Sequence, residues 1–139
     1  MACLSLISVL NHGIRNFYKL RRILAVDDDN DIVDIIKIIL EDEGYEVSTL
    51  TNGREVMQTI SLQRPDLILL DVMLGGIDGR DICRAIKGDA SLKDIPIVMI
   101  SASHNLHNLL NEKGSPNDFI AKPFDIDHLI KKVNAQFAA

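Results

Sequence analysis

The sequence has too few cysteines for the disulfides that stabilise small secreted domains, and it has no segment suited to crossing a lipid bilayer. Its only cysteines are Cys3 and Cys83, and their number and separation fit neither a disulfide framework nor a zinc site. No apolar stretch approaches the roughly 18–20 residues that a transmembrane helix requires. We therefore expect free thiols in a reducing compartment, no membrane association and a cytoplasmic location.

The first 21 residues differ in charge from the rest of the chain. Residues 3–10 are apolar, but no basic residues precede them and no small-residue cleavage site follows, which argues against a signal peptide. Four basic and no acidic residues give residues 1–22 a charge of +4, and subtracting this from the net −5 of the whole chain leaves −9 for residues 23–139. Such an acidic domain is a poor ligand for nucleic acid. We interpret residues 1–21 as an extension, flexible or added during cloning, in preference to a docking arm.

From residue 22 onward, strand and helix patterns alternate. The 139 residues, 47% hydrophobic and 25% charged, have the size and composition of one globular domain. Short apolar runs predict strands, and apolar residues at helical spacing predict the segments between them. The expected strands are 23–26, 45–49, 66–70, 96–100 and 118–121. The expected helices are one with apolar residues from Ile32 to Leu40 that Gly44 closes, one that carries Val56, Met57 and Ile60 and stops before Pro65, and those at 80–87, 104–113 and 125–137. This order predicts an α/β fold, a doubly wound parallel sheet of five strands covered by five helices.

Four of the apolar runs end on residues that can do chemistry. The first runs into Asp27-Asp28-Asp29, the third into Asp71, the fourth into Ser101 and the fifth into Lys122. In open parallel sheets, ligands bind beyond the carboxyl ends of the strands. We therefore expect carboxylates, a hydroxyl and an amine to meet at one edge of the sheet.

The acidic residues of this group suit a hard divalent cation. Mg²⁺ is usually held by one or two carboxylates together with water and substrate phosphate, and Asp27, Asp28 and Asp71 could supply the carboxylates. Asp29 is better explained as the cap of the following helix. A calcium-binding EF-hand loop is excluded, because Ile32 and Ile38 occupy its required Gly and Glu positions.

Asp71 is a candidate nucleophile. A carboxylate beside Mg²⁺ can attack phosphorus and form an aspartyl phosphate. Transfer of a phosphoryl group depends on positioning and on donors for its equatorial oxygens. Lys122 and Ser101 are the candidate donors at the same sheet edge.

Four ordered strings resemble the receiver domain of two-component response regulators. They are ILAVDDD (23–29), DLILLDVML (66–74), PIVMISA (96–102) and DFIAKPF (118–124). Each string alone is weakly specific, whereas the ordered set, over about residues 22–137, is highly specific. The resemblance implies a flavodoxin-like, CheY-like fold with strand order 2-1-3-4-5.

The resemblance also assigns the acidic residues. Asp71 is similar to the phospho-accepting aspartate, which takes its phosphoryl group from a phosphohistidine on a sensor histidine kinase or a histidine phosphotransfer protein. Asp28 corresponds to the direct Mg²⁺ ligand, and Asp27 to the acid that acts largely through water. Met73 stands where the family offers a backbone carbonyl to the metal.

The remaining positions of the resemblance concern the response to phosphorylation. Ser101 corresponds to the switch hydroxyl, Phe119 to the switch aromatic and Lys122 to the lysine that contacts the phosphoryl group. Lys122-Pro123 resembles the family's cis peptide. One departure is Gly75-Gly76 in place of Pro-Gly, from which we expect a looser loop.

These points predict a phosphorylation-operated signalling module rather than an enzyme with an external substrate. We expect a stand-alone receiver, a monomer or weak dimer, whose fourth helix, fifth strand and fifth helix change their surface and so control a protein effector. The fourth helix (104–113) is weak because it is rich in Asn.

Two other classes of protein are less consistent with the sequence. A Mg²⁺-dependent phosphohydrolase of the haloacid dehalogenase type also forms an aspartyl phosphate, but it needs an acid where Met73 stands. A flavodoxin-like FMN binder needs a hydroxyl- and glycine-rich phosphate loop after the first strand, where Asp27-Asp28-Asp29 would repel phosphate.

Overall fold

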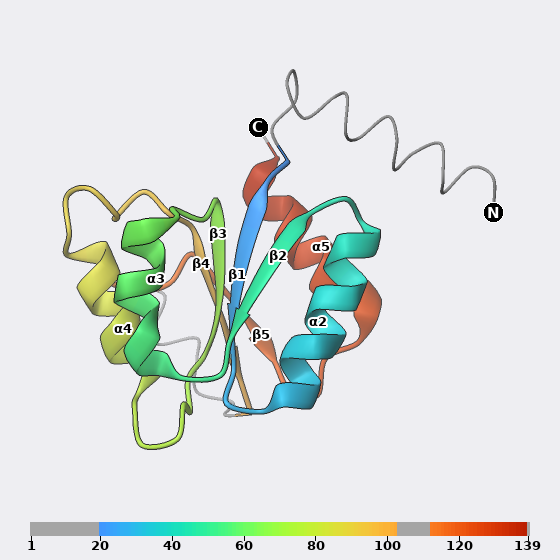
Figure 1. Cartoon of the computed structure of the whole chain (residues 1–139), viewed down its shortest axis with the longest axis horizontal. Helices are drawn as coiled ribbons and strands as arrows, with labels where there is room; N and C mark the ends of the chain where they lie inside the picture. Colours follow the sequence, from blue (N-terminus) through green and yellow to red (C-terminus); the bar gives the residue numbers. More distant parts are fainter. Residues whose placement is uncertain (1–19, 103–111, 139) are drawn as a thin grey trace.

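A computed structural model describes residues 20–102 and 112–138, which form a parallel five-stranded sheet between two layers of helices (Figure 1). All neighbouring strands are parallel, as the sequence pattern predicts, and their order is β2-β1-β3-β4-β5, as the resemblance implies. The strands are β1 (Arg22–Val26), β2 (Glu46–Leu50), β3 (Leu67–Asp71), β4 (Ile97–Ser101) and β5 (Asp118–Ala121).

Four of the five expected helices lie in the described residues, and they cover the two faces of the sheet. In Figure 1, α2 (Asn30–Asp42) and α5 (Ile126–Phe137) lie on one side, and α3 (Val56–Leu62) and α4 (Gly79–Lys87) on the other. A short 3-10 helix, η1 (Gly53–Glu55), precedes α3. The expected helix at 104–113 falls mostly outside the described residues. None of the described helices combines the length and apolar character needed to cross a membrane.

The central strands are buried on both faces, and this burial determines their register in the sheet. Every residue of β3 and β4 is buried. Ile68 and Leu70 pack into the core beneath α3 and α4, whereas Leu67 and Leu69 pack into the core beneath α2 and α5. Burying such a side chain stabilises the fold by roughly 1.5–3 kcal/mol. A shift of one residue in register would exchange the two cores, so the polar residues that follow the strands are held in place.

Short polar side chains begin the helices near the carboxyl ends of the strands. Asp29 accepts a hydrogen bond from the backbone N–H of Asp31 at 2.9 Å and caps α2, as expected from the sequence. Asp78 caps α4 and Asp125 caps α5 in the same way. Each cap contributes about 0.5–2 kcal/mol.

The loop after β3 differs from the sequence-based expectation of a loose segment. Gly75 and Gly76 have φ angles of +55° and +92°, the left-handed values that a tight hairpin turn requires. Leu74 and Ile77 exchange backbone hydrogen bonds of 3.0 and 3.3 Å, and Met73 pairs with Asp78 beyond them. The two glycines therefore close an ordered hairpin next to the end of β3.

Gly79, the first residue of α4, lies directly against the backbone at the end of β3. Its N–H donates to the carbonyl of Val72 at 2.7 Å. A Cβ atom at this position would lie 2.1 Å from the carbonyl oxygen of Asp71 and 3.2 Å from Cα of Val72. Because both neighbours are backbone atoms, only a shift of the chain itself could make room.

We expect Gly79→Ala to destabilise the protein by about 3 kcal/mol or more, at the upper end of the cost of overpacking a core. Chemical denaturation measures the change in the free energy of unfolding. Gly76→Ala is the matched control, because its Cβ would meet open space and its cost would come from the φ angle alone, about 1–3 kcal/mol. Equal losses in the two variants would contradict the proposed clash at Gly79.

Candidate functional site

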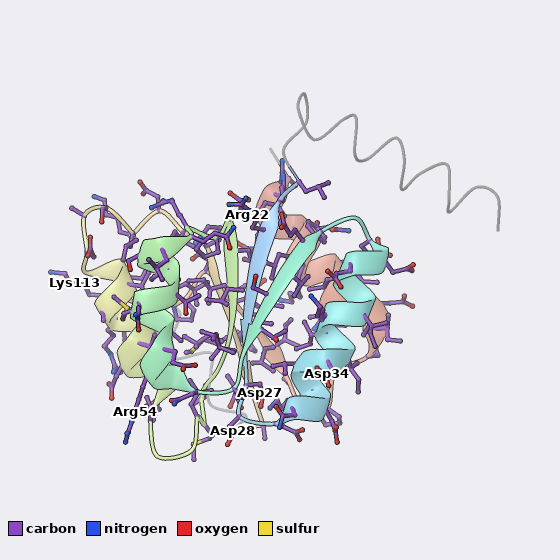
Figure 2. The ribbon with its side chains drawn as sticks, viewed as in Figure 1. Arg22, Asp27, Asp28, Asp34, Arg54 and Lys113 are labelled. Atoms are coloured by element: carbon purple, nitrogen blue, oxygen red, sulfur yellow. The ribbon has the colours of Figure 1, made fainter. Side chains whose placement is uncertain are left out.

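The strand ends bring the sequence-predicted site residues together at one edge of the sheet. Asp27 and Asp28 follow β1, Asp71 ends β3, Ser101 ends β4 and Lys122 follows β5. These four strands are neighbours in the sheet, so their carboxyl ends lie side by side. Figure 2 shows Asp27 and Asp28 at the end of β1 opposite to Arg22, where the chain enters the sheet.

Three carboxylates form a compact acidic cluster at this edge. One oxygen from each of Asp27, Asp28 and Asp71 lies within 4.8 Å of the other two. Asp27 is 1% and Asp71 4% exposed, whereas Asp28 is exposed to solvent. The cluster therefore has a buried base and an open side from which an ion or a phosphoryl group can approach.

Lys122 connects the two buried carboxylates. Its Nζ atom lies 2.8 Å from Oδ2 of Asp27 and 3.2 Å from Oδ2 of Asp71. The peptide bond between Lys122 and Pro123 is cis, as the resemblance implies. Lys122 belongs to the loop after the edge strand β5, and its ammonium reaches across the sheet to Asp27, which follows β1, and to Asp71, which ends β3.

The charges of the cluster do not balance. Burial and the negative charge of Asp27 raise the pKa of Asp71 above its ordinary value, in spite of the opposing effect of Lys122. Burial alone would lower the pKa of Lys122, but its hydrogen bonds and charge contacts with Asp27 and Asp71 raise it. Lys122 therefore stays protonated, and the ionised Asp71 carries a cost on folding. That cost is absent below the pKa of the unfolded carboxyl and develops as the pH rises through the folded value.

The residues present fit a divalent cation. Three clustered carboxylates and one ammonium leave excess negative charge, and hard cations such as Mg²⁺ prefer oxygen ligands of this kind. Both oxygens of Asp27 already accept hydrogen bonds, Oδ1 from the N–H of Asp29 at 3.0 Å and Oδ2 from Lys122. Asp71 likewise accepts hydrogen bonds from Lys122 and from the N–H of Met73, whereas no hydrogen bond to the Asp28 carboxylate occurs among the described contacts. Asp28 is thus the carboxylate best placed for direct coordination.

Ser101 and Met73 are neighbours of Asp71, the first in the adjacent strand and the second two residues further along the chain. Ser101 is 3% exposed and ends β4, beside β3, whose last residue is Asp71. The backbone N–H of Met73 donates to the Asp71 carboxylate, and the Met73 side chain is exposed. If Met73 acts through its backbone, its thioether side chain does not need to take part.

Phe119, the expected switch aromatic, is half-buried in β5 and packs against the core beneath α3 and α4. Lys132 of α5 places its Nζ 5.6 Å from the centre of the Phe119 ring, and the same ammonium pairs with Asp118 at 2.9 Å. Sequence reasoning did not find Lys132, because a lysine on a solvated helix face carries no signal of its own.

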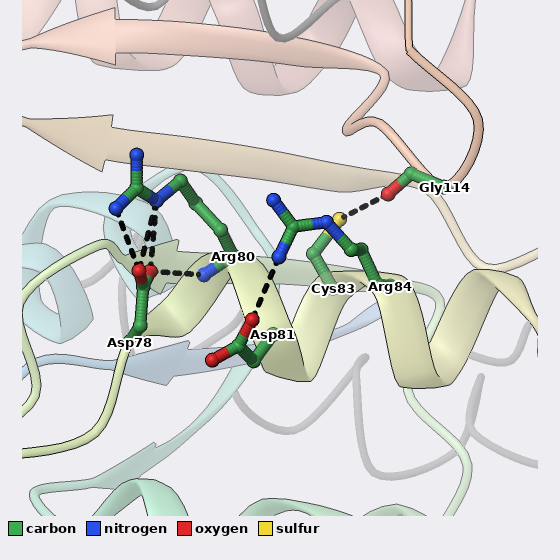
Figure 3. Close-up of polar contacts among 6 residues, drawn as sticks. All are labelled: Asp78, Arg80, Asp81, Cys83, Arg84 and Gly114. Carbon is green, nitrogen blue, oxygen red and sulfur yellow. Dashed lines mark hydrogen bonds and ion pairs between the residues drawn. The ribbon is translucent and has the colours of Figure 1, made fainter.

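The start of α4 is held by charged side chains that sequence reasoning also missed. Arg80 folds back on the capping Asp78, with Nη2 and Oδ2 2.6 Å apart, and this contact lowers the pKa of Asp78 (Figure 3). Arg84 pairs with Asp81 at 2.7 Å one turn further on (Figure 3). Exposed pairs of this kind contribute about 0–1 kcal/mol each. They flank Gly79 and so support the segment that packs against Asp71.

The cysteine on α4 is not a reactive group. Cys83 is buried, and its thiol lies 3.5 Å from the carbonyl of Gly114 (Figure 3). Burial raises the pKa of the thiol to about 11, so it stays protonated near neutral pH. Thiolate chemistry at Cys83 is therefore not available.

Comparison with known proteins agrees with this architecture. Residues 23–134 match the family described as the response regulator receiver domain. The chain is 35% identical over 117 residues to the DNA-binding response regulator MtrA of Mycolicibacterium paratuberculosis, covering 84% of this chain and 51% of that protein. The chain thus spans about half the length of the curated relatives it matches.

Solved structures give the same result. The receiver domain of a signal transduction histidine kinase from Syntrophus aciditrophicus superposes with a TM-score of 0.75 at 34% identity, over 84% of this chain and 89% of that one. The chemotaxis response regulator CheY4 of Vibrio cholerae superposes with a TM-score of 0.78 at 28% identity, over 85% and 99%. The chain belongs to the receiver domain family of two-component response regulators.

Proposed function

We propose that Asp71 accepts a phosphoryl group and that this domain works as a phosphorylation-operated switch. The observation that carries the proposal is the buried carboxylate of Asp71 in contact with Lys122 and clustered with Asp27 and Asp28. Lys122 is positioned to donate to a phosphoryl oxygen where it now donates to Asp71. The N–H of Met73, which now donates to the Asp71 carboxylate, orients this nucleophile.

The donor that suits this site is a phosphohistidine on a sensor histidine kinase or a histidine phosphotransfer protein. An Oδ atom of Asp71 attacks the phosphorus, and a P–O bond forms while the P–N bond of the phosphohistidine breaks. The electron pair of the broken bond stays on the imidazole nitrogen, which takes up a proton. Asp71 must be ionised for this attack, and Lys122 favours the ionised form.

Asp28, Asp71 and the backbone carbonyl of Met73 would hold Mg²⁺, with Asp27 acting through water. When bound, Mg²⁺ neutralises the charge that builds up on the phosphoryl oxygens. Asp27 also positions Lys122, whose ammonium would otherwise be held only by Asp71. Within the acidic cluster, Asp28 and Asp71 would thus bind the ion, and Asp27 would position Lys122.

Phosphorylation would change a surface through Ser101 and Phe119. A phosphoryl group on Asp71 attracts the Ser101 hydroxyl at the end of the adjacent strand, which leaves room for the Phe119 ring to turn inward. The surface of β5, α5 and the segment expected as the fourth helix, which lies outside the described residues, would change with it. The added charge of the phosphoryl group would then shift this surface between two conformations.

We propose a protein effector as the recipient of this signal and a cytoplasmic location for the domain. Binding of DNA is a property given for MtrA, whereas residues 23–139 here carry a charge of −9 and have little attraction for phosphate backbones. A phosphohydrolase function is disfavoured, because the exposed Met73 side chain cannot protonate a leaving alcohol.

The first experiment tests the phospho-acceptor. Incubation with Mg²⁺ and acetyl phosphate should add the mass of one phosphoryl group to the wild-type protein and none to Asp71→Asn. Asp94→Asn, a change at an exposed acid outside the cluster, should be phosphorylated like the wild type. Modification that persists in Asp71→Asn, or steady turnover of phosphomonoesters without a stable adduct, would exclude the proposal.

The second experiment tests the metal ligands. Asp28→Asn removes one carboxylate from the cluster, and we expect the Kd for Mg²⁺ to rise about tenfold or more, since about 1.4 kcal/mol corresponds to a factor of ten. The Mg²⁺-dependent increase in Tm reports this affinity. Asp29→Asn is the matched control, because Asn also caps helices and Asp29 lies outside the cluster. An equal loss of Mg²⁺ affinity in the two variants would show that the affinity depends on the total negative charge and not on Asp28 as a ligand.

The third experiment separates phosphorylation from the response to it. Ser101→Ala keeps Asp71 and its neighbours, so we expect the variant to accept the phosphoryl group from acetyl phosphate. Without the hydroxyl, the amide shift changes along β5 and α5 on phosphorylation should be much smaller than in the wild type. Identical shift changes in the two proteins would rule out Ser101 as the switch residue.

A further inference from the structure

A groove between α2 and α5 exposes apolar side chains on the side of the sheet opposite to α3 and α4. Its volume is about 560 Å³, and its apolar lining consists of Ile38 and Ile39 of α2 and Ile126 and Ile130 of α5. Ile38 is 70% and Ile126 56% exposed, although both are large apolar residues. Contiguous apolar surface with a polar border is typical of interaction sites.

The border of this groove is acidic. Glu41, Asp42 and Glu43 lie at the end of α2, and Asp127 lies in the first turn of α5. Lys37 pairs with Glu41 at 3.3 Å, which leaves the charges of the other three acids without a neighbouring ion pair among the described contacts. A fitting occupant is therefore apolar on one side and positively charged beside it.

The chain itself supplies a segment of this kind. Cys3, Ile7, Leu10, Ile14 and Phe17 follow one another at spacings of 4, 3, 4 and 3, which would place them on one stripe of a helix. Residues 1–19 contain two basic side chains and no acidic ones. Apolar periodicity and positive charge thus complement the isoleucines and the acidic border of the groove.

The point where this segment joins the domain lies on the same side as the groove. Arg21 places its guanidinium 4.4 Å from the centre of the Phe137 ring at the end of α5, and it donates to the Phe137 carbonyl at 3.3 Å. As a helix, nineteen residues span about 28 Å, which is close to the 30–35 Å across a domain of this size. The segment therefore has sufficient length to reach the groove from its attachment beside α5.

In place of the free extension that the sequence alone favours, we propose that residues 1–19 occupy the groove between α2 and α5 of their own chain, with the apolar stripe against Ile38, Ile126 and Ile130. The basic side chains would lie near the acidic border. In this arrangement the segment competes with any protein that docks on the α2–α5 face. The proposal does not depend on phosphorylation of Asp71.

A spin label on the full-length chain tests this placement. Ser8→Cys carries the label in a chain in which Cys3→Ala removes the thiol of Cys3 and keeps an apolar side chain there, and the buried Cys83 stays unlabelled. We expect amide signals of the groove residues to lose intensity when the label is paramagnetic and to recover it when the label is reduced. Signals from α3, on the opposite face, should keep their intensity and serve as the internal reference.

Charge variants test the acidic border. Asp42→Lys and Glu43→Lys should restore much of the lost intensity, and both changes are compatible with folding because basic residues suit the C-terminal end of a helix. Asp94→Lys, an exposed change of the same size that lies outside the groove, should leave the broadening as it was. Equal recovery in all three variants would contradict a role for the border.

A mixture of labelled and isotope-enriched chains distinguishes the source of the effect. Broadening of the groove within one chain, with none between chains, supports the proposal. Broadening that passes between chains would assign the groove to a second copy, and no selective broadening in either sample would mean that residues 1–19 do not occupy it. Either result would overturn the proposal.

Discussion

The contact of Lys122 with Asp27 and Asp71 is the interaction on which the rest of the site depends. It brings together Asp27 from the loop after β1, Asp71 at the end of β3 and Lys122 from the loop after β5, so it depends on the register of these strands. Two carboxylates are buried beneath an ammonium, an arrangement whose net contribution to stability is small because desolvation offsets attraction. The buried charges therefore contribute little to the stability of the fold, which depends on the apolar packing of β3 and β4.

Much of the fold could be predicted because its signals are local or periodic. The buried strands are uninterrupted apolar runs, and the end of each run marks the point where a polar side chain reaches the sheet edge. The role of Asp29 as a helix cap could be predicted because capping involves residues only two apart. The placement of Asp27, Asp71 and Ser101 at one edge follows from strand order, which the resemblance supplied.

Other features could not be predicted because they depend on contacts between distant segments. The sequence around Gly79 indicates a loop and a helix start, and nothing in it reveals that a backbone carbonyl lies where a side chain would be. Gly75-Gly76 was expected to loosen the loop, since glycine is flexible in isolation, but here its left-handed φ angles are those that the hairpin needs. The position of Lys132 over Phe119 likewise follows from the packing of α5 against β5.

Asp29 links the acidic cluster to the first turn of α2. Its backbone N–H holds one oxygen of Asp27, while its own carboxylate holds the N–H of Asp31 inside the helix. The hydrogen bond to Asp27 therefore joins the acidic cluster to the N-terminal end of a helix 13 residues long. Ile38 and Ile39 of the same helix line the groove, so α2 carries both a hydrogen-bonded neighbour of the acidic cluster and part of the α2–α5 face.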